Sequence, residues 1–68
     1  MSKGILTTRE KQVFELLIQN KTTKEIAKML NISEKTVRNH ISNAMQKLGV
    51  KGRAGAVVEL LKLKEISL

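Results

Sequence analysis

The chain has 68 residues and a formal net charge of +7, with no cysteine, no proline, one histidine and 1% aromatic residues. This length allows one domain, and the lack of cysteine excludes a disulfide framework or a thiolate zinc site. With a single histidine and no aspartate, a metal site or catalytic triad is not expected, so we expect no enzyme and no cofactor. No apolar segment is long enough for a membrane span or signal peptide, and we expect a complete cytoplasmic protein.

The basic charge indicates a polyanionic partner, which would be nucleic acid or an anionic membrane. A basic domain that is merely soluble is the plain alternative. Modules that bind single strands stack bases on aromatic rings, and Phe14 is the only Phe, Tyr or Trp in the chain. Duplex DNA is therefore favoured over single-stranded nucleic acid.

Start and stop residues divide the chain into four helices without any strand, which predicts an all-α fold. Two Thr-x-x-Glu capping boxes begin the first two helices, and a serine cap begins the third. Asparagine or glycine in left-handed backbone is expected to end the first three. The start residues are Thr7 with Glu10, Thr22 with Glu25, and Ser33, and the stop residues are Asn20, Asn31 and Gly49. The predicted helices cover about 8–19, 23–30, 34–48 and 53–64.

The apolar residues predict which faces of the last two helices are buried. In the third helix they form a narrow stripe, consisting of Val37, Ile41, Ala44 and Leu48. In the fourth they cover an arc of about 220°, whereas docking on one core needs about 100°, so a second buried surface is expected. We assign Ala56, Val57 and Leu60 to the core, and Ala54, Val58 and Leu61 to a homodimer interface.

The second and third helices are separated only by residues 31–33, which is the spacing of a helix-turn-helix. Ile32 in this turn is expected to fill the gap between the two helices, and His40 to be partly buried. The polar face of the third helix has an unusual composition, because no acidic residue occurs between Glu34 and Glu59. Arginine can read guanine and asparagine can read adenine in the major groove. The predicted base contacts are Arg38, Asn39, Ser42 and Lys35, with a solubilising polar face as the alternative.

Two further groups of residues are candidates for contacts with the DNA backbone. Thr22, Thr23 and Lys24 lie at the start of the second helix, where hydroxyls, free N–H groups and the helix dipole suit a phosphate. Simple capping by Thr22 is the alternative there. Asn43 lies on the polar face of the third helix, and we expect it to contact the backbone as well.

Taken in order, these residues make the sequence resemble the LuxR-type helix-turn-helix family over about residues 5–66. The matching positions are Leu6–Glu10, Lys24–Ala27, Ile32–Ser33, Thr36–Arg38, His40, Asn43, Lys47–Val50, Arg53 and Ala56–Val57. Residues 33–61 are most similar to the branch of this family that acts in late spore formation. Two positions depart from the family pattern, namely Asn20, where glycine is usual, and Gly55 inside the fourth helix.

The resemblance implies a four-helix domain whose third helix is the recognition helix and whose fourth helix is the dimer helix. It implies a transcription activator or repressor that binds duplex DNA as a dimer, works with RNA polymerase, and is associated with the nucleoid. By position, Arg38, Asn39 and Ser42 would touch bases. Backbone contacts would come from Lys24, Thr36, Lys47 and the start of the second helix.

Two other functions remain open at this point. A non-specific architectural DNA-binding protein would share the charge, but it would not need the base-reading side chains of the third helix. A cationic amphipathic protein acting on membranes is disfavoured because the chain has no tryptophan and its apolar faces are needed for a core. We therefore expect no membrane partner.

Overall fold

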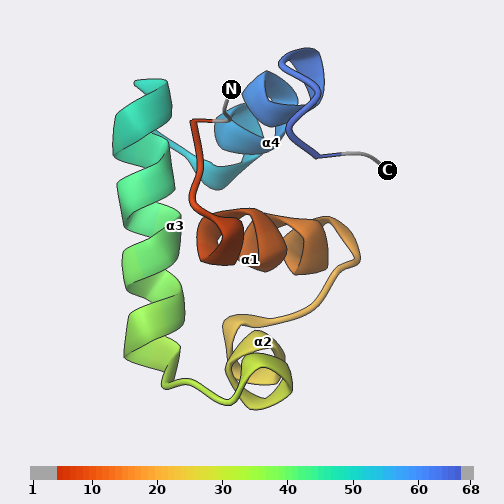
Figure 1. Cartoon of the computed structure of the whole chain (residues 1–68), viewed down its shortest axis with the longest axis vertical. Coiled ribbons are helices and arrows are strands. Elements are labelled where there is room, and N and C mark those ends of the chain that lie inside the picture. The colour runs from red at the N-terminus through yellow and green to blue at the C-terminus, as the bar shows by residue number, and fades with distance from the viewer. Residues whose placement is uncertain (1–4, 67–68) are drawn as a thin grey trace.

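The computed structural model describes residues 5–66, which form α1 (Thr8–Ile18), α2 (Thr23–Leu30), α3 (Glu34–Leu48) and α4 (Arg53–Lys62). This confirms the predicted all-α fold with four helices. Helix α3 runs along one side of the molecule, with α2 beside its lower end, α1 beside its middle and α4 beside its upper end (Figure 1). In this described part of the chain, no helix has the length and apolar character needed to cross a bilayer.

The predicted caps begin the first three helices. At α1 and α2, the threonine hydroxyl accepts a hydrogen bond of 3.1 Å from the N–H of the glutamate three residues later. The glutamate carboxylate in turn accepts from the threonine N–H, at 3.0 Å in α1 and 2.8 Å in α2. At α3, the Ser33 hydroxyl accepts from the Thr36 N–H at 3.0 Å. These bonds use N–H groups that have no partner inside the helix.

Each of the four helices ends in a Schellman motif, in which a left-handed residue lets two consecutive N–H groups bond back into the last turn. At α1, for example, Asn20 N–H donates to the Leu17 carbonyl at 3.0 Å, and Lys21 N–H donates to the Leu16 carbonyl at 3.2 Å. The left-handed residues are Asn20, Asn31, Gly49 and Lys64, with φ of 69°, 59°, 69° and 59°. The first three were predicted, and all three are confirmed.

Two predicted helix ends were wrong. Helix α1 ends at Ile18, and Gln19 is its cap, one residue before the predicted end. Helix α4 ends at Lys62 rather than at 64, because Lys64 takes a left-handed conformation. The chain turns there, and Ile66 becomes 5% exposed in the core. Burial of Ile66 offsets the strain of a lysine in left-handed backbone, and no glycine or asparagine marks this turn in the sequence.

Lys64→Gly is therefore expected to stabilise the protein by about 1 kcal/mol, because glycine adopts left-handed backbone without steric strain. Urea unfolding followed by circular dichroism measures the change. Lys62→Gly is the matched control, and it is expected to destabilise because Lys62 is the last helical residue of α4. Equal effects of the two substitutions would contradict this reading of the turn.

The core lies where the inner faces of the four helices meet. Its largest fully buried side chains are Phe14, Ile26, Leu60, Val13 and Val37. Ile32 packs partly buried against this core, as expected for the residue that fills the turn between α2 and α3. On α4, Ala56 and Leu60 are 0% exposed, which confirms them as core residues. Val57, predicted on the same side, is only partly buried against the core, as is Leu61, which was predicted on the opposite side.

Candidate nucleic-acid interface

The outward face of α3 carries the predicted base contacts together. Val37, Ile41 and Ala44 are buried on the opposite face, so the rotation of the helix about its axis is set by the core. The exposed residues are Lys35, Arg38, Asn39, Ser42, Asn43, Gln46 and Lys47. A helix with its side chains is about 10–12 Å wide, which matches a major groove about 12 Å wide. This face can therefore enter a major groove without any change in the fold.

Arg38 has a partner on its own helix that the sequence analysis did not identify. Its Nη1 lies 3.4 Å from Oε1 of Glu34, and the two side chains are 56% and 42% exposed. The spacing of a glutamate four residues before an arginine was the available signal, because such residues are neighbours on a helix surface. The contact is long and solvated, which makes it a weak ion pair.

Lys47 has a much stronger contact, which joins the end of α3 to the start of α1. Its Nζ donates a hydrogen bond of 2.7 Å to Oε1 of Glu10, and this same oxygen accepts from the Thr7 N–H. The Glu10 side chain is 4% exposed, and that of Lys47 is 37% exposed. No local pattern could have revealed this pair, because its members are 37 positions apart. Lys47 was predicted only as a DNA backbone contact, and it also has this structural partner.

The surroundings of Glu10 stabilise its ionised form. Burial by itself raises the pKa of this carboxyl group. The hydrogen bonds from Lys47 and from the Thr7 backbone, with the electrostatic influence of Lys47 and His40, together outweigh burial and hold the pKa of Glu10 below its usual value. Glu10 is thus a buried anion that depends on a cation from α3. His40 is partly buried, as predicted.

At the start of α2, a glutamate carboxylate already occupies part of the predicted phosphate site. Oε1 of Glu25 accepts the Thr22 N–H at 2.8 Å, and this hydrogen bond lowers the pKa of Glu25. Within residues 5–66, the N–H groups of Thr23 and Lys24 have no hydrogen-bond acceptor, so they stay available for a phosphate. Lys24 is exposed and Thr23 is partly exposed.

Thr36, the other threonine predicted to touch the DNA backbone, is engaged at the start of α3. Its hydroxyl lies 2.9 Å from that of Ser33, and its N–H donates to the same Ser33 oxygen. Because one hydroxyl group can both donate and accept, Thr36 retains hydrogen-bonding capacity beyond this contact.

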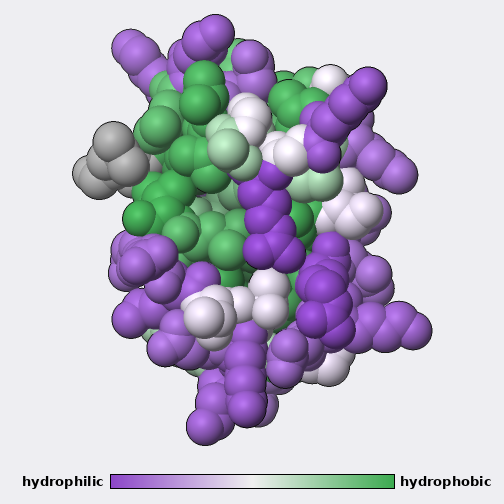
Figure 2. Space-filling view, turned by 180° about the vertical axis from the view of Figure 1, so that it is seen from behind, coloured by the Kyte–Doolittle hydropathy of each residue, from purple (hydrophilic) through white to green (hydrophobic). Residues whose placement is uncertain are grey.

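Apolar side chains also reach the surface, at the end of the molecule that holds α4. Figure 2, seen from behind, shows hydrophobic surface gathered over the upper half of the molecule, with polar side chains around the lower half. Val58 is 51% exposed and Ala54 is exposed, whereas Leu61 is partly buried against the core. Ile5 and Leu63, which were not predicted as interface residues, are 45% and 47% exposed.

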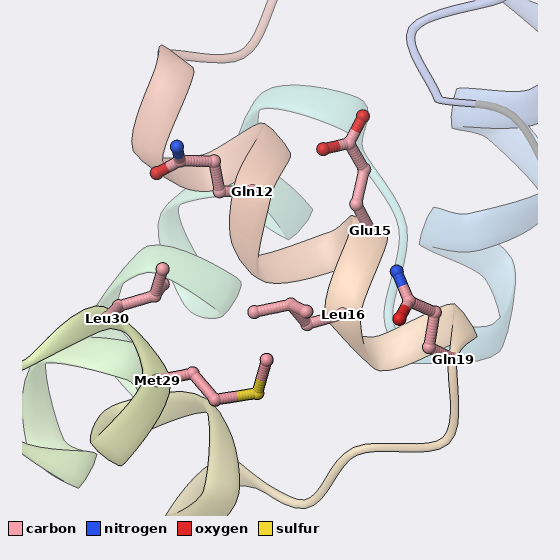
Figure 3. Close-up of a pocket in the computed structure, with 6 residues that line it drawn as sticks. All are labelled: Gln12, Glu15, Leu16, Gln19, Met29 and Leu30. Atoms are coloured by element: carbon pink, nitrogen blue, oxygen red, sulfur yellow. The ribbon is translucent and has the colours of Figure 1, made fainter.

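A separate pocket lies between α1 and α2, away from the predicted site residues (Figure 3). Its volume is about 250 Å³. Leu16, Leu30 and the 56% exposed Met29 form its apolar part, and Gln12, Glu15 and Gln19 complete the lining. In the described part of the chain, no three His, Cys, Asp or Glu side chains come together as a metal site would require.

The sequence and the arrangement of the four helices both match those of known proteins. Residues 4–60 match the family model described as bacterial regulatory proteins, luxR family. The chain belongs to the LuxR family of bacterial regulatory proteins. It is 75% identical over 67 residues to the spore germination protein GerE of Bacillus subtilis, covering 98% of this chain and 90% of that protein. A solved structure of the transcription factor GerE superposes with a TM-score of 0.93 at 57% identity, covering 96% of this chain and 97% of the other.

Longer members of the LuxR family contain the same domain as one part of their length. The transcriptional regulatory protein DegU of Brevibacillus brevis is 48% identical over 58 residues, which is 85% of this chain and 25% of DegU. Family membership thus confirms the resemblance found from the sequence, including the helix-turn-helix formed by α2 and α3.

Proposed function

We propose that this protein is a sequence-specific DNA-binding transcription regulator that acts in spore formation. The observation that carries the proposal is the exposed face of α3, where Arg38 and Asn39 stand outward from a helix anchored by its buried side. The relatives support it, since GerE is named a spore germination protein and a transcription factor. Arg38, Asn39, Ser42 and Lys35 would contact bases, and no enzymatic activity is proposed.

The backbone contacts are proposed to flank this face on both sides. The free N–H groups of Thr23 and Lys24 would hold one phosphate at the start of α2, aided by the Thr22 hydroxyl. Thr36, Asn43 and Lys47 would contact phosphates along α3. Such contacts position the protein on the duplex, whereas the base contacts select the sequence. The regulator would then work on the nucleoid, in contact with RNA polymerase.

Two copies are proposed to bind together through α4. One molecule measures 29 × 25 × 22 Å, which is less than the roughly 34 Å of one helical turn that separates half-sites of a helix-turn-helix dimer. One copy can therefore cover one half-site, and a second copy can occupy the next. Ala54, Val58 and Leu61 form the proposed interface, because they continue the apolar surface of α4 beyond the core.

Selection of bound sequences from a random duplex library, at near-physiological salt, tests the proposed function. Enrichment of a short motif is the expected result, and two copies at one-turn spacing would support the dimer. Binding without enrichment would instead favour a non-specific architectural protein and would make Arg38 and Asn39 phosphate contacts. No binding to duplex DNA would overturn both functions.

Val58→Lys is expected to shift the protein from dimer to monomer, because it places a charge in the proposed apolar interface. Val58 is a better site for this test than Leu61, since Leu61 also packs against the core and its replacement would disturb the fold. Analytical ultracentrifugation over a range of concentrations measures the shift. Met29→Lys is the matched control, because Met29 is 56% exposed, comparable to the 51% of Val58, and lies on α2. A Val58→Lys protein with unchanged association would argue against this interface.

A further inference from the structure

The pocket between α1 and α2 is a hydrophobic site that neither of the proposed partners covers. The outward face of α3 is proposed for DNA, and α4 for a second copy of the chain. Within residues 5–66 the most exposed large apolar side chain is Met29, at 56%, and it lines this pocket. Leu16, Leu30 and Met29 point toward one another there (Figure 3). The other exposed large apolar residues lie at the end of the molecule that holds α4, and they are Ile5, Val58 and Leu63.

The pocket faces away from the surface that is proposed to hold DNA. Its lining residues Gln12 and Glu15 lie about 200° and about 140° around α1 from Glu10, at about 100° for each residue. Glu10 marks the side of α1 that meets α3, because its carboxylate accepts the 2.7 Å hydrogen bond from Lys47. The pocket is closed on its other side by the last two residues of α2, at the opposite end from the proposed phosphate site. A partner can therefore occupy the pocket while α3 lies in the groove.

The charge of the pocket suits a basic protein segment rather than nucleic acid. Glu15 is the one charged residue in its lining, in a chain that has 13 lysines and arginines. Within residues 5–66 no cation pairs with Glu15, whereas three other glutamates have such a partner. This carboxylate would repel a phosphate and attract a lysine or arginine. The amides of Gln12 and Gln19, beside it on α1, can both donate and accept hydrogen bonds.

We propose that this pocket binds RNA polymerase, by receiving an apolar side chain from a polymerase segment that carries a lysine or arginine beside it. The volume of about 250 Å³ is smaller than the roughly 300–1,000 Å³ of small-molecule sites, and it suits one anchoring side chain. The flexible side chain of Met29 can adapt to the shape of that anchor. The inference rests on the proposed function, which brings the polymerase to the DNA-bound regulator.

Met29→Lys tests the inference, with the protein bound to a short duplex that carries the selected site and no promoter. Protein in excess keeps every duplex occupied, so that the affinity for DNA does not enter, and the binding of purified RNA polymerase holoenzyme is measured. We expect it to weaken about tenfold, because an ammonium group replaces an apolar contact of the anchor. Met29→Leu stays apolar and should keep the binding. Thermal unfolding shows that each variant is folded.

Glu15→Gln tests the charge of the pocket in the same measurement. We expect polymerase binding to weaken about two- to fivefold, which is the size of one exposed ion pair. Glu65→Gln is the matched control, because it makes the same change in net charge outside the pocket, and within residues 5–66 Glu65 also has no ion-pair partner. It should leave polymerase binding unchanged, whereas a general electrostatic effect would alter both variants equally.

The absence of cysteine from the chain allows the contact to be located directly. Gln12→Cys places a single thiol at the exposed rim of the pocket, where a benzophenone maleimide can be attached. On the selected duplex this label should cross-link to a polymerase subunit. Lys62→Cys, at a 70% exposed position of α4, carries the same label away from the pocket and should give no such product.

Polymerase binding that survives both Met29→Lys and Glu15→Gln would overturn the inference, while the polymerase contact itself would stand. Reduced self-association of Met29→Lys would assign the pocket to a second copy and would also overturn it. If the unaltered protein binds its selected duplex but no polymerase, the inference fails with sequence-specific binding intact. If the unaltered protein prefers no sequence, the proposed function fails first, so the two failures are distinguished.

Discussion

Arg38→Ala is expected to weaken binding to the selected duplex by about 5- to 150-fold, equivalent to about 1–3 kcal/mol for one bidentate base contact. Binding to random duplex should change much less, because those complexes depend on phosphate contacts. Preference at one base position should also relax. Fluorescence anisotropy with duplexes that vary one base pair at a time measures both effects.

Arg53→Ala is the control for this substitution, because it removes the same charge from an exposed position at the start of α4. It is expected to weaken all duplexes to a similar, smaller extent without changing the preferred base. If Arg38→Ala behaved in the same way, Arg38 would be a phosphate contact, and base selection would have to come from Asn39, Ser42 or Lys35.

Lys47→Met is expected to lower the free energy of unfolding by about 1–2 kcal/mol near neutral pH, because it leaves the buried Glu10 carboxylate without its cation. The effect should be smaller than for a fully buried pair, since the Lys47 side chain is 37% exposed. Methionine keeps the apolar stem of lysine, so the loss reports on charge rather than on packing. Denaturant unfolding at pH 7 measures it.

The same variant has a distinctive dependence on pH. In the unaltered protein the pKa of Glu10 is lowered by folding, so its stabilising contribution is present above the pKa of the unfolded chain and is lost as pH falls through the folded pKa. Without Lys47, burial is opposed only by the Thr7 hydrogen bond and by His40, so the pKa of Glu10 is expected to be higher in the variant than in the unaltered protein. The ionised form of Glu10 then contributes less to stability. The difference in stability between the two proteins should therefore shrink below about pH 4.5.

Unfolding curves at several values between pH 3 and pH 7 test this expectation. Lys62→Met is the control, because Lys62 pairs with Glu59 only at 4.0 Å on an exposed surface, and little change is expected at any pH. A stability difference for Lys47→Met that stayed constant over this range would show that the ammonium group does not set the pKa of Glu10. Weaker DNA binding by Lys47→Met would be interpreted only where the variant is fully folded.

The helix starts and most of the helix ends were predictable because their causes are local. A capping box joins residues three apart, and a Schellman motif joins residues three and five apart, so Thr7, Thr22, Ser33, Asn20 and Gly49 each indicated a boundary. The polar face of α3 was equally accessible, because helical periodicity separates Arg38 and Asn39 from the buried Val37 and Ile41. The family resemblance depends on the same local patterns.

Capping, helix-end and periodicity patterns involve residues close together in the sequence, so they could not predict contacts between distant segments. The pairing of Glu10 with Lys47 required α1 and α3 to pack first, since the two residues meet across 37 positions of the chain. The end of α4 at Lys62 depended on the core accepting Ile66, and this burial outweighed the local preference against a left-handed Lys64. Local chemistry thus sets where helices begin, how most of them end and which faces they bury. Packing determines which charges meet and where the last helix stops, because burial free energy exceeds local preferences there.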